Sequence, residues 1–106
     1  MAQAFNQQAG ILRQALANGA PLFPPPNDDP DDVFIQVFSR RQKSRGYKCT
    51  TGYGLLKFFI GSRHNINTRV IGKVAGELWA NTNRQNKEAY NELSNQVNLR
   101  IKRYRL

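Results

Sequence analysis

The side chains that most often carry out catalysis are scarce in this sequence and stand alone. Cys49 is the single cysteine and His64 the single histidine, so the chain can form neither an internal disulfide nor a zinc finger, which needs four Cys or His ligands. His64 has no acidic neighbour in the sequence, Cys49 has no His-type base beside it, and Gly52-Tyr53-Gly54 is too short for a phosphate-binding loop. We therefore expect no catalytic activity, no cofactor and no metal ion.

A run of acids is the one candidate cation site. Residues 27–32 read Asn-Asp-Asp-Pro-Asp-Asp, and carboxylates at this density are able to hold a hard cation. The run lacks the glycine turn and the distal glutamate of a calcium loop. A solvated linker is therefore the favoured interpretation.

Net charge is the strongest chemical signal in the chain. The 106 residues include 16 Lys+Arg and 7 Asp+Glu, which gives a formal net charge of +9 at pH 7. Residues 1–38 hold one base, Arg13, and four of the acids, whereas residues 39–106 hold all the other bases and three acids. Such an excess predicts a polyanionic partner, nucleic acid above all, bound by the later two-thirds of the chain.

The elements that must position these charges begin with a helix and a linker. The length suits one small domain with appended segments, and no apolar run approaches the roughly 18 residues of a membrane span. Residues 3–18 have apolar side chains at helical spacing, which predicts an amphipathic helix ending at Gly19. The proline-rich segment that follows predicts a linker. The apolar stretch 33–38 fits either one or two helical turns or a strand, and an extended basic segment continues to Lys48.

Three further helices are expected toward the C-terminus. The first covers about residues 53–63, and the second begins at Asn67 or Thr68, either of which is a good helix cap. The third begins after Thr82, whose hydroxyl forms a capping box with Gln85.

The apolar stripes of these three helices predict one shared core. Phe59, Trp79 and Tyr90 lie one on each stripe, and a common aromatic core is favoured over a role in base stacking. The other main core positions are Leu55, Leu56, Ile60, Val70, Ile71, Val74, Ala75, Leu78, Leu93, Val97 and Ile101. So small a core leaves a net stability of only about a few kcal/mol.

A spaced pattern of residues runs through the second and third of these helices. Residues 71–79 read Ile-Gly-Lys-Val-Ala-Gly-Glu-Leu-Trp, and Lys87 and Tyr90 follow the tryptophan. This pattern resembles an HMG box, whose second helix reads Ile-Ser-Lys-x-Leu-Gly-x-x-Trp and is followed at the same two spacings by a lysine and an aromatic residue. The match covers residues 50–104 and is strongest over 66–104.

The first helix fits the family's opening phrase, Asn-Ala-Phe-x-x-Phe/Tyr-Arg, in two registers. Residues 51–57 keep the aromatic residue, the apolar pair and the cation, although the interval to the second helix is then shorter than usual. The alternative places the phrase at residues 37–40 and requires a long insertion. We favour the first register. In both, the base-contacting asparagine of the family is replaced, by Thr51 or by Val33.

The resemblance implies an all-α fold in which three helices form an L whose concave face binds and bends duplex DNA in the minor groove. The family's wedge position falls on Gly54, so Leu55 is the substitute candidate, and Gly72 replaces a serine. The residues that this alignment assigns to DNA contact are Thr51, Tyr53, Leu55, Lys57, Arg63, Thr68, Arg69, Ile71, Gly72, Lys73, Arg100, Lys102, Arg103 and Arg105.

The expected organisation has three parts: an N-terminal amphipathic helix (1–20), a Pro/Asp-rich and then basic extended linker (21–48), and an HMG-box-like domain (49–106). Residues 23–25, Phe-Pro-Pro, are similar to a phrase that precedes the box in the fungal mating-type group. The resemblance thus implies a monomeric transcription regulator that binds double-stranded DNA in the nucleus. The acid-free N-terminal helix leaves the mitochondrion as a lesser alternative. No membrane association is expected.

Two other functions stay open. Short, highly basic chains are also usual among small RNA-binding proteins such as ribosomal proteins, which would prefer structured RNA to bent DNA. A protein-interaction module would instead dock a partner helix on residues 3–18, with the basic half serving only solvation. DNA binding that survives deletion of residues 1–30 would count against such a module.

Overall fold

The computed structural model describes the backbone of residues 2–41 and 49–105, with the side chains of 4–37 and 49–103. This part of the chain contains helices and no strands, which confirms the all-α prediction. The helices are α1 (Ala2–Asn18), α2 (Pro30–Arg41), α3 (Gly52–Arg63), α4 (Thr68–Asn81) and α5 (Arg84–Arg105).

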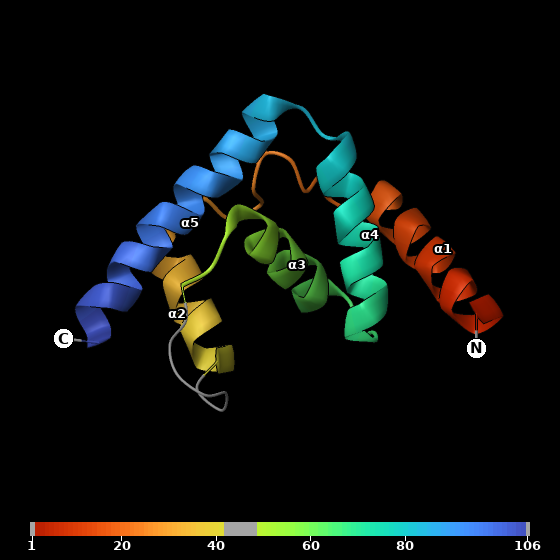
Figure 1. Ribbon diagram of the computed structural model, residues 1–106, viewed down its shortest axis with the longest axis horizontal. Coiled ribbons are helices and arrows are strands. Elements are labelled where there is room, and N and C mark those ends of the chain that lie inside the picture. Colours follow the sequence, from red (N-terminus) through yellow and green to blue (C-terminus); the bar gives the residue numbers. More distant parts are fainter. Residues whose placement is uncertain (1, 42–48, 106) are drawn as a thin grey trace.

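The helices are arranged around a wide angle between α4 and α5. These two helices diverge from the turn at residues 82–83, and α3 lies in the opening between them, packed on both (Figure 1). α1 packs on α4 at one side of the molecule, and α2 packs on α5 at the other. The molecule measures 46 × 32 × 19 Å, so it is about two helices thick and most helices keep one face in solvent.

Local side-chain bonds fix where α3, α4 and α5 begin. The Thr51 hydroxyl accepts a hydrogen bond from the Gly54 N–H, and the Asn67 side chain accepts one from the Arg69 N–H. The expected start of the second C-terminal helix is thereby confirmed. These side chains satisfy backbone donors that have no partner within the helix.

The capping box predicted at Thr82 and Gln85 is wrong by one residue. The cap of α5 is Asn83, whose side-chain oxygen accepts from the Asn86 N–H at 2.8 Å. Thr82 instead ends α4, since its N–H bonds the Leu78 carbonyl, and its hydroxyl accepts from the Asn86 side chain at 2.9 Å. Threonine and asparagine are both good caps, so adjacent positions compete for the role.

The extended linker predicted for residues 21–48 is wrong over Pro30–Arg41, which form α2. The Asp29 carboxylate accepts from the Asp31 N–H at 3.1 Å, and proline at the first helical position is already set for helical geometry. Val33 and Val37, one turn apart, are buried. The acidic run is therefore the start of a helix that packs on α5. Residues 42–48 lie outside the described part of the chain.

The N-terminal helix is confirmed, and its apolar face is covered. Ala9, Leu12 and Leu16 are buried and belong to the main core, with α1 packed on α4 of the same chain. The apolar face that the protein-interaction alternative assigned to a partner helix is therefore packed on α4 of the same chain.

One aromatic cluster joins α3, α4 and α5, as predicted. The ring of Trp79 lies 6.0 Å from Tyr53 on one side and 6.0 Å from Tyr90 on the other, and Phe59 lies 6.0 Å from Tyr90. All three pairs meet edge to face, the favourable aromatic geometry. The buried Tyr90 hydroxyl donates to the Leu22 carbonyl at 2.6 Å, and burial raises the pKa of this phenol.

Two close approaches hold the segment before α3 against α5. The Asn98 side chain accepts from the Thr50 N–H at 2.7 Å and donates to the Thr50 carbonyl at 2.9 Å. Gly52 packs so tightly on α5 that a Cβ there would meet the Asn91 backbone nitrogen and the Trp79 ring, each at 3.0 Å. These contacts set the angle at which α3 enters the space between α4 and α5.

Candidate nucleic-acid interface

The candidate interface is built on α3 and the first half of α4. No acidic residue occurs between Asp32 and Glu77, although nine basic residues do. Of these bases, Lys57, Arg69 and Lys73 lie on the described helices with exposed side chains. The stretch thus supplies positive charge with no carboxylate on α3 or in the first turns of α4 to offset it.

Tyr53 links the two helices of this surface. Its hydroxyl donates to the Gly72 carbonyl on α4 at 3.0 Å, and its ring lies 4.9 Å below the Lys57 ammonium. A cation at this distance from an aromatic face is attracted to it. A Cβ at Gly72 would meet nothing within 4 Å, so the surface beside Tyr53 is open. Lys57, Tyr53 and Gly72 therefore lie together, from two helices, on one exposed side.

The N-terminal turn of α4 continues this surface. Thr68 and Arg69 are exposed, and the first turn carries no acid that would offset the positive end of the helix dipole. Residues 69, 72 and 76 share one helical face. The Gly72 carbonyl accepts a hydrogen bond from the Tyr53 hydroxyl, and a Cβ at Gly76 would lie 3.5 Å from that hydroxyl. Arg69 is therefore on the side of α4 that faces Tyr53.

The only acid on α3 and α4, Glu77, is neutralised by α1. Arg13 makes two hydrogen bonds of 2.7 Å to the Glu77 carboxylate, and the Lys73 ammonium lies 3.7 Å from it. The bond from Arg13 is the main cause that lowers the pKa of Glu77, and the nearby charges of Arg13 and Lys73 lower it further. Glu77 is thus shared by two cations, so this part of α1 and α4 keeps a net positive charge.

The substitute wedge candidate is wrong. Leu55 has no exposed surface, and Ile71, a predicted groove contact, is 8% exposed. Both belong to the main core, where a Cβ at Gly61 would lie 3.7 Å from Ile71. Helical periodicity places Leu55 on the same face of α3 as Phe59, which points into the core and not into solvent. Neither side chain is therefore able to insert between base pairs.

Two predicted phosphate contacts already have partners inside the chain. Arg63 donates to the Ala20 carbonyl at 2.7 Å, which ties the end of α3 to the segment after α1. Arg100 donates to the Gln96 carbonyl at 2.8 Å and pairs with Asp31 on α2. Both retain some exposure, but each side chain is held by these contacts.

The remaining residues predicted to contact DNA lie at the start of α3 and near the end of α5. Thr51 is exposed but caps α3, whereas Lys102 and Arg103 are exposed near the end of α5. Arg103 lines a shallow depression beside Asp31. The side chain of Arg105 lies outside the described residues. The structure thus brings together the α3 and α4 candidates, and the C-terminal cations form a second group beside α2.

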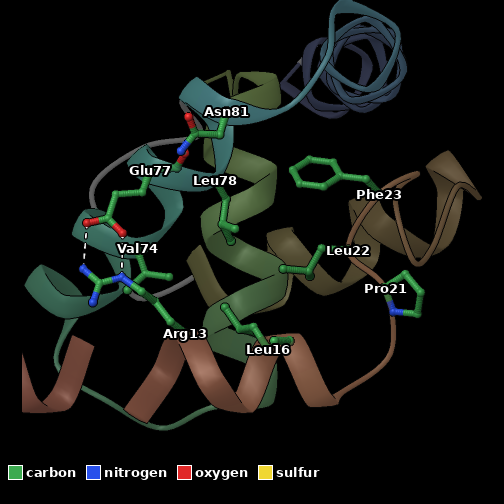
Figure 2. Close-up of a pocket in the computed structure, with 10 residues that line it drawn as sticks. Arg13, Leu16, Pro21, Leu22, Phe23, Val74, Glu77, Leu78 and Asn81 are labelled. Atoms are coloured by element: carbon green, nitrogen blue, oxygen red, sulfur yellow. Dashed lines mark hydrogen bonds and ion pairs between the residues drawn. The ribbon is translucent and has the colours of Figure 1, made fainter. Parts of the chain in front are cut away.

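A hollow lies elsewhere, between α1, the segment that follows it and α4 (Figure 2). It has a volume of about 490 Å³, and its lining is mainly apolar. Leu16, Leu22 and Val74 point into it, and the pair of Arg13 and Glu77 closes one end (Figure 2). None of the residues predicted to contact DNA lines this hollow.

Two residues that shape the interface were not predicted as part of it. Arg13 acts on Glu77 from 64 positions away, and Asp31 acts on Arg100 from 69 positions away. Neither pairing has a signal in the local sequence, because both depend on how α1 and α2 pack. The only hint was that Arg13 is the single base before residue 39.

Comparison with known proteins gives no match to a family model, a curated protein or a solved structure. In the described part of the chain, no helix combines the length and apolar character that crossing a membrane requires. The same residues include no group of three or more His, Cys, Asp or Glu side chains placed to hold a metal ion.

Proposed function

We propose that this protein binds double-stranded DNA, with α3 and the first half of α4 as the main contact surface and the cations near the end of α5 as further phosphate contacts. The observation that carries the proposal is the positive charge of these two helices: Lys57 and Arg69 are exposed on the side of Tyr53, and Lys73 is exposed one turn before Glu77, whose carboxylate it shares with Arg13. A surface of one charge sign attracts a polyanion and raises the rate of encounter.

The helical arrangement supports a more specific proposal, an HMG-box-like mode of binding. Tyr53 and Trp79, which the resemblance assigns to two different helices of the box, share one core. The helices assigned to the second and third positions diverge, with the first between them (Figure 1). In this proposal the protein acts in the nucleus as a transcription regulator similar to the fungal mating-type group.

Affinity comes mainly from phosphate contacts in this mechanism. Gly54, at the wedge position, has no side chain, and Leu55 is buried. Neither residue therefore supplies a wedge whose contacts with the base pairs would offset the cost of unstacking them. Among the candidates whose side chains the structure describes, five cations are exposed: Lys57, Arg69, Lys73, Lys102 and Arg103. Neutralising about five phosphates gives a slope near −4.5 for log affinity against log salt concentration.

A gel-shift panel tests the proposal against the RNA-binding alternative. We expect binding to a linear duplex and to a four-way DNA junction, with weaker binding to a structured RNA hairpin of equal charge. The salt slope on the linear duplex should lie near −4.5. Preference for the RNA hairpin, or a slope shallower than about −2, would contradict DNA binding by this surface.

A further inference from the structure

The basic end of α5 is engaged by the acidic start of α2. The Arg100 guanidinium lies 2.5 Å from an Asp31 carboxylate oxygen, and the same guanidinium donates to the Gln96 carbonyl. Asp31, Phe34, Arg100 and Arg103 together line a depression of about 320 Å³. An anion therefore already lies beside Arg100 and Arg103, two of the cations that the resemblance assigns to DNA contact.

The contact is poorly suited to a structural role. The Asp31 side chain is 75% exposed and that of Arg100 is 23% exposed, and a pair of this kind contributes little stability. α2 is held on α5 by the buried Val33 and Val37, and its N-terminus is capped by Asp29. Loss of the ion pair would leave both of these features in place.

We propose that Asp31 is an autoinhibitory group that occupies Arg100 and so keeps this guanidinium from a DNA phosphate. The inference rests on the proposed function, since the phosphate is that of the bound duplex. A carboxylate and a phosphate oxygen compete for the same guanidinium donors, because both form charge-assisted hydrogen bonds with arginine. α2 thereby lowers the affinity of the protein for DNA without blocking the surface on α3 and α4.

The test compares Asp31→Asn with Asp28→Asn. Each variant removes one negative charge, but Asp28 is exposed and takes no part in the Arg100 contact. We expect Asp31→Asn to bind a 20-base-pair duplex about two- to fivefold more tightly than wild type, which is the range of an exposed ion pair. Its salt slope should steepen by about 0.9, because one more phosphate is neutralised. Asp28→Asn should change affinity less than twofold.

Equal effects of the two variants on duplex affinity would overturn the inference, since they would reflect net charge alone.

A second readout needs no DNA. The rate at which phenylglyoxal modifies Arg100 is followed by mass spectrometry in the wild-type and Asp31→Asn proteins, with folding checked by circular dichroism. Asp31→Asn should react several-fold faster, and equal rates would overturn the inference. A wild-type protein that fails to bind the duplex would overturn the proposed function, whatever the Arg100 rates.

Discussion

Single glycines control how closely the helices approach and how open the candidate interface is. At Gly52 the backbone of α3 lies against Asn91 and Trp79, so there is no room for a side chain. At Gly72 the opposite holds, because a Cβ would meet nothing within 4 Å. The same residue type therefore serves packing at one position and exposure at the other.

These two environments predict opposite effects of the same substitution. Gly52→Ala should lower the free energy of unfolding by about 1–3 kcal/mol, because a Cβ is forced against a backbone atom and a ring. Gly72→Ala should raise it by about 1 kcal/mol, because alanine favours the helix and nothing clashes. Urea denaturation followed by circular dichroism measures both. A stabilising Gly52→Ala would show that α3 does not lie so close to α5.

Local sequence signals predicted some residue-scale features and missed others. Asn67 was predicted as one of two caps for α4, since the choice depends only on its neighbours. Arg63 and Arg100 were predicted to touch phosphate, but each has a partner contributed by a distant segment. Charge and spacing identify a cation, whereas its partner depends on tertiary packing.

At the scale of elements, α2 shows why a helix was mistaken for a linker. Asp29, Pro30 and the acids after them are good helix-start signals, but residues 33–38 are too short for periodicity to separate a helix from a strand. The contact with α5 decides the outcome by burying Val33 and Val37. In contrast, α4 and α5 have long apolar stripes and were predicted correctly.

The element-scale prediction concerns the aromatic cluster. Trp79 is the link between Tyr53 on α3 and Tyr90 on α5, so Trp79→Ala should unfold the domain, at a cost of about 3–5 kcal/mol. Loss of helical signal in far-ultraviolet circular dichroism at 25 °C checks this. A folded Trp79→Ala protein would mean that the three helices are held together without the cluster.

At the scale of the whole molecule, the two N-terminal helices adjust the charge of the domain they cover. α1 brings Arg13 to the only acid of α3 and α4, whereas α2 brings Asp31 to a C-terminal cation. The sequence predicted the separation of charge between the two parts of the chain. It did not predict these contacts, because α1 and α2 are placed by packing between distant segments.

The most direct test of the account reverses charge on the proposed surface. The variant Arg69→Glu with Lys73→Glu is compared with Arg84→Glu with Lys87→Glu, which changes the net charge equally but lies at the start of α5. We predict at least about a tenfold loss of duplex affinity for the first pair, because two phosphate contacts are lost, with helicity unchanged in circular dichroism. The second pair should lose less than about threefold, through long-range charge alone. Unchanged affinity of the first pair, or equal losses in both, would contradict DNA binding by α3 and α4.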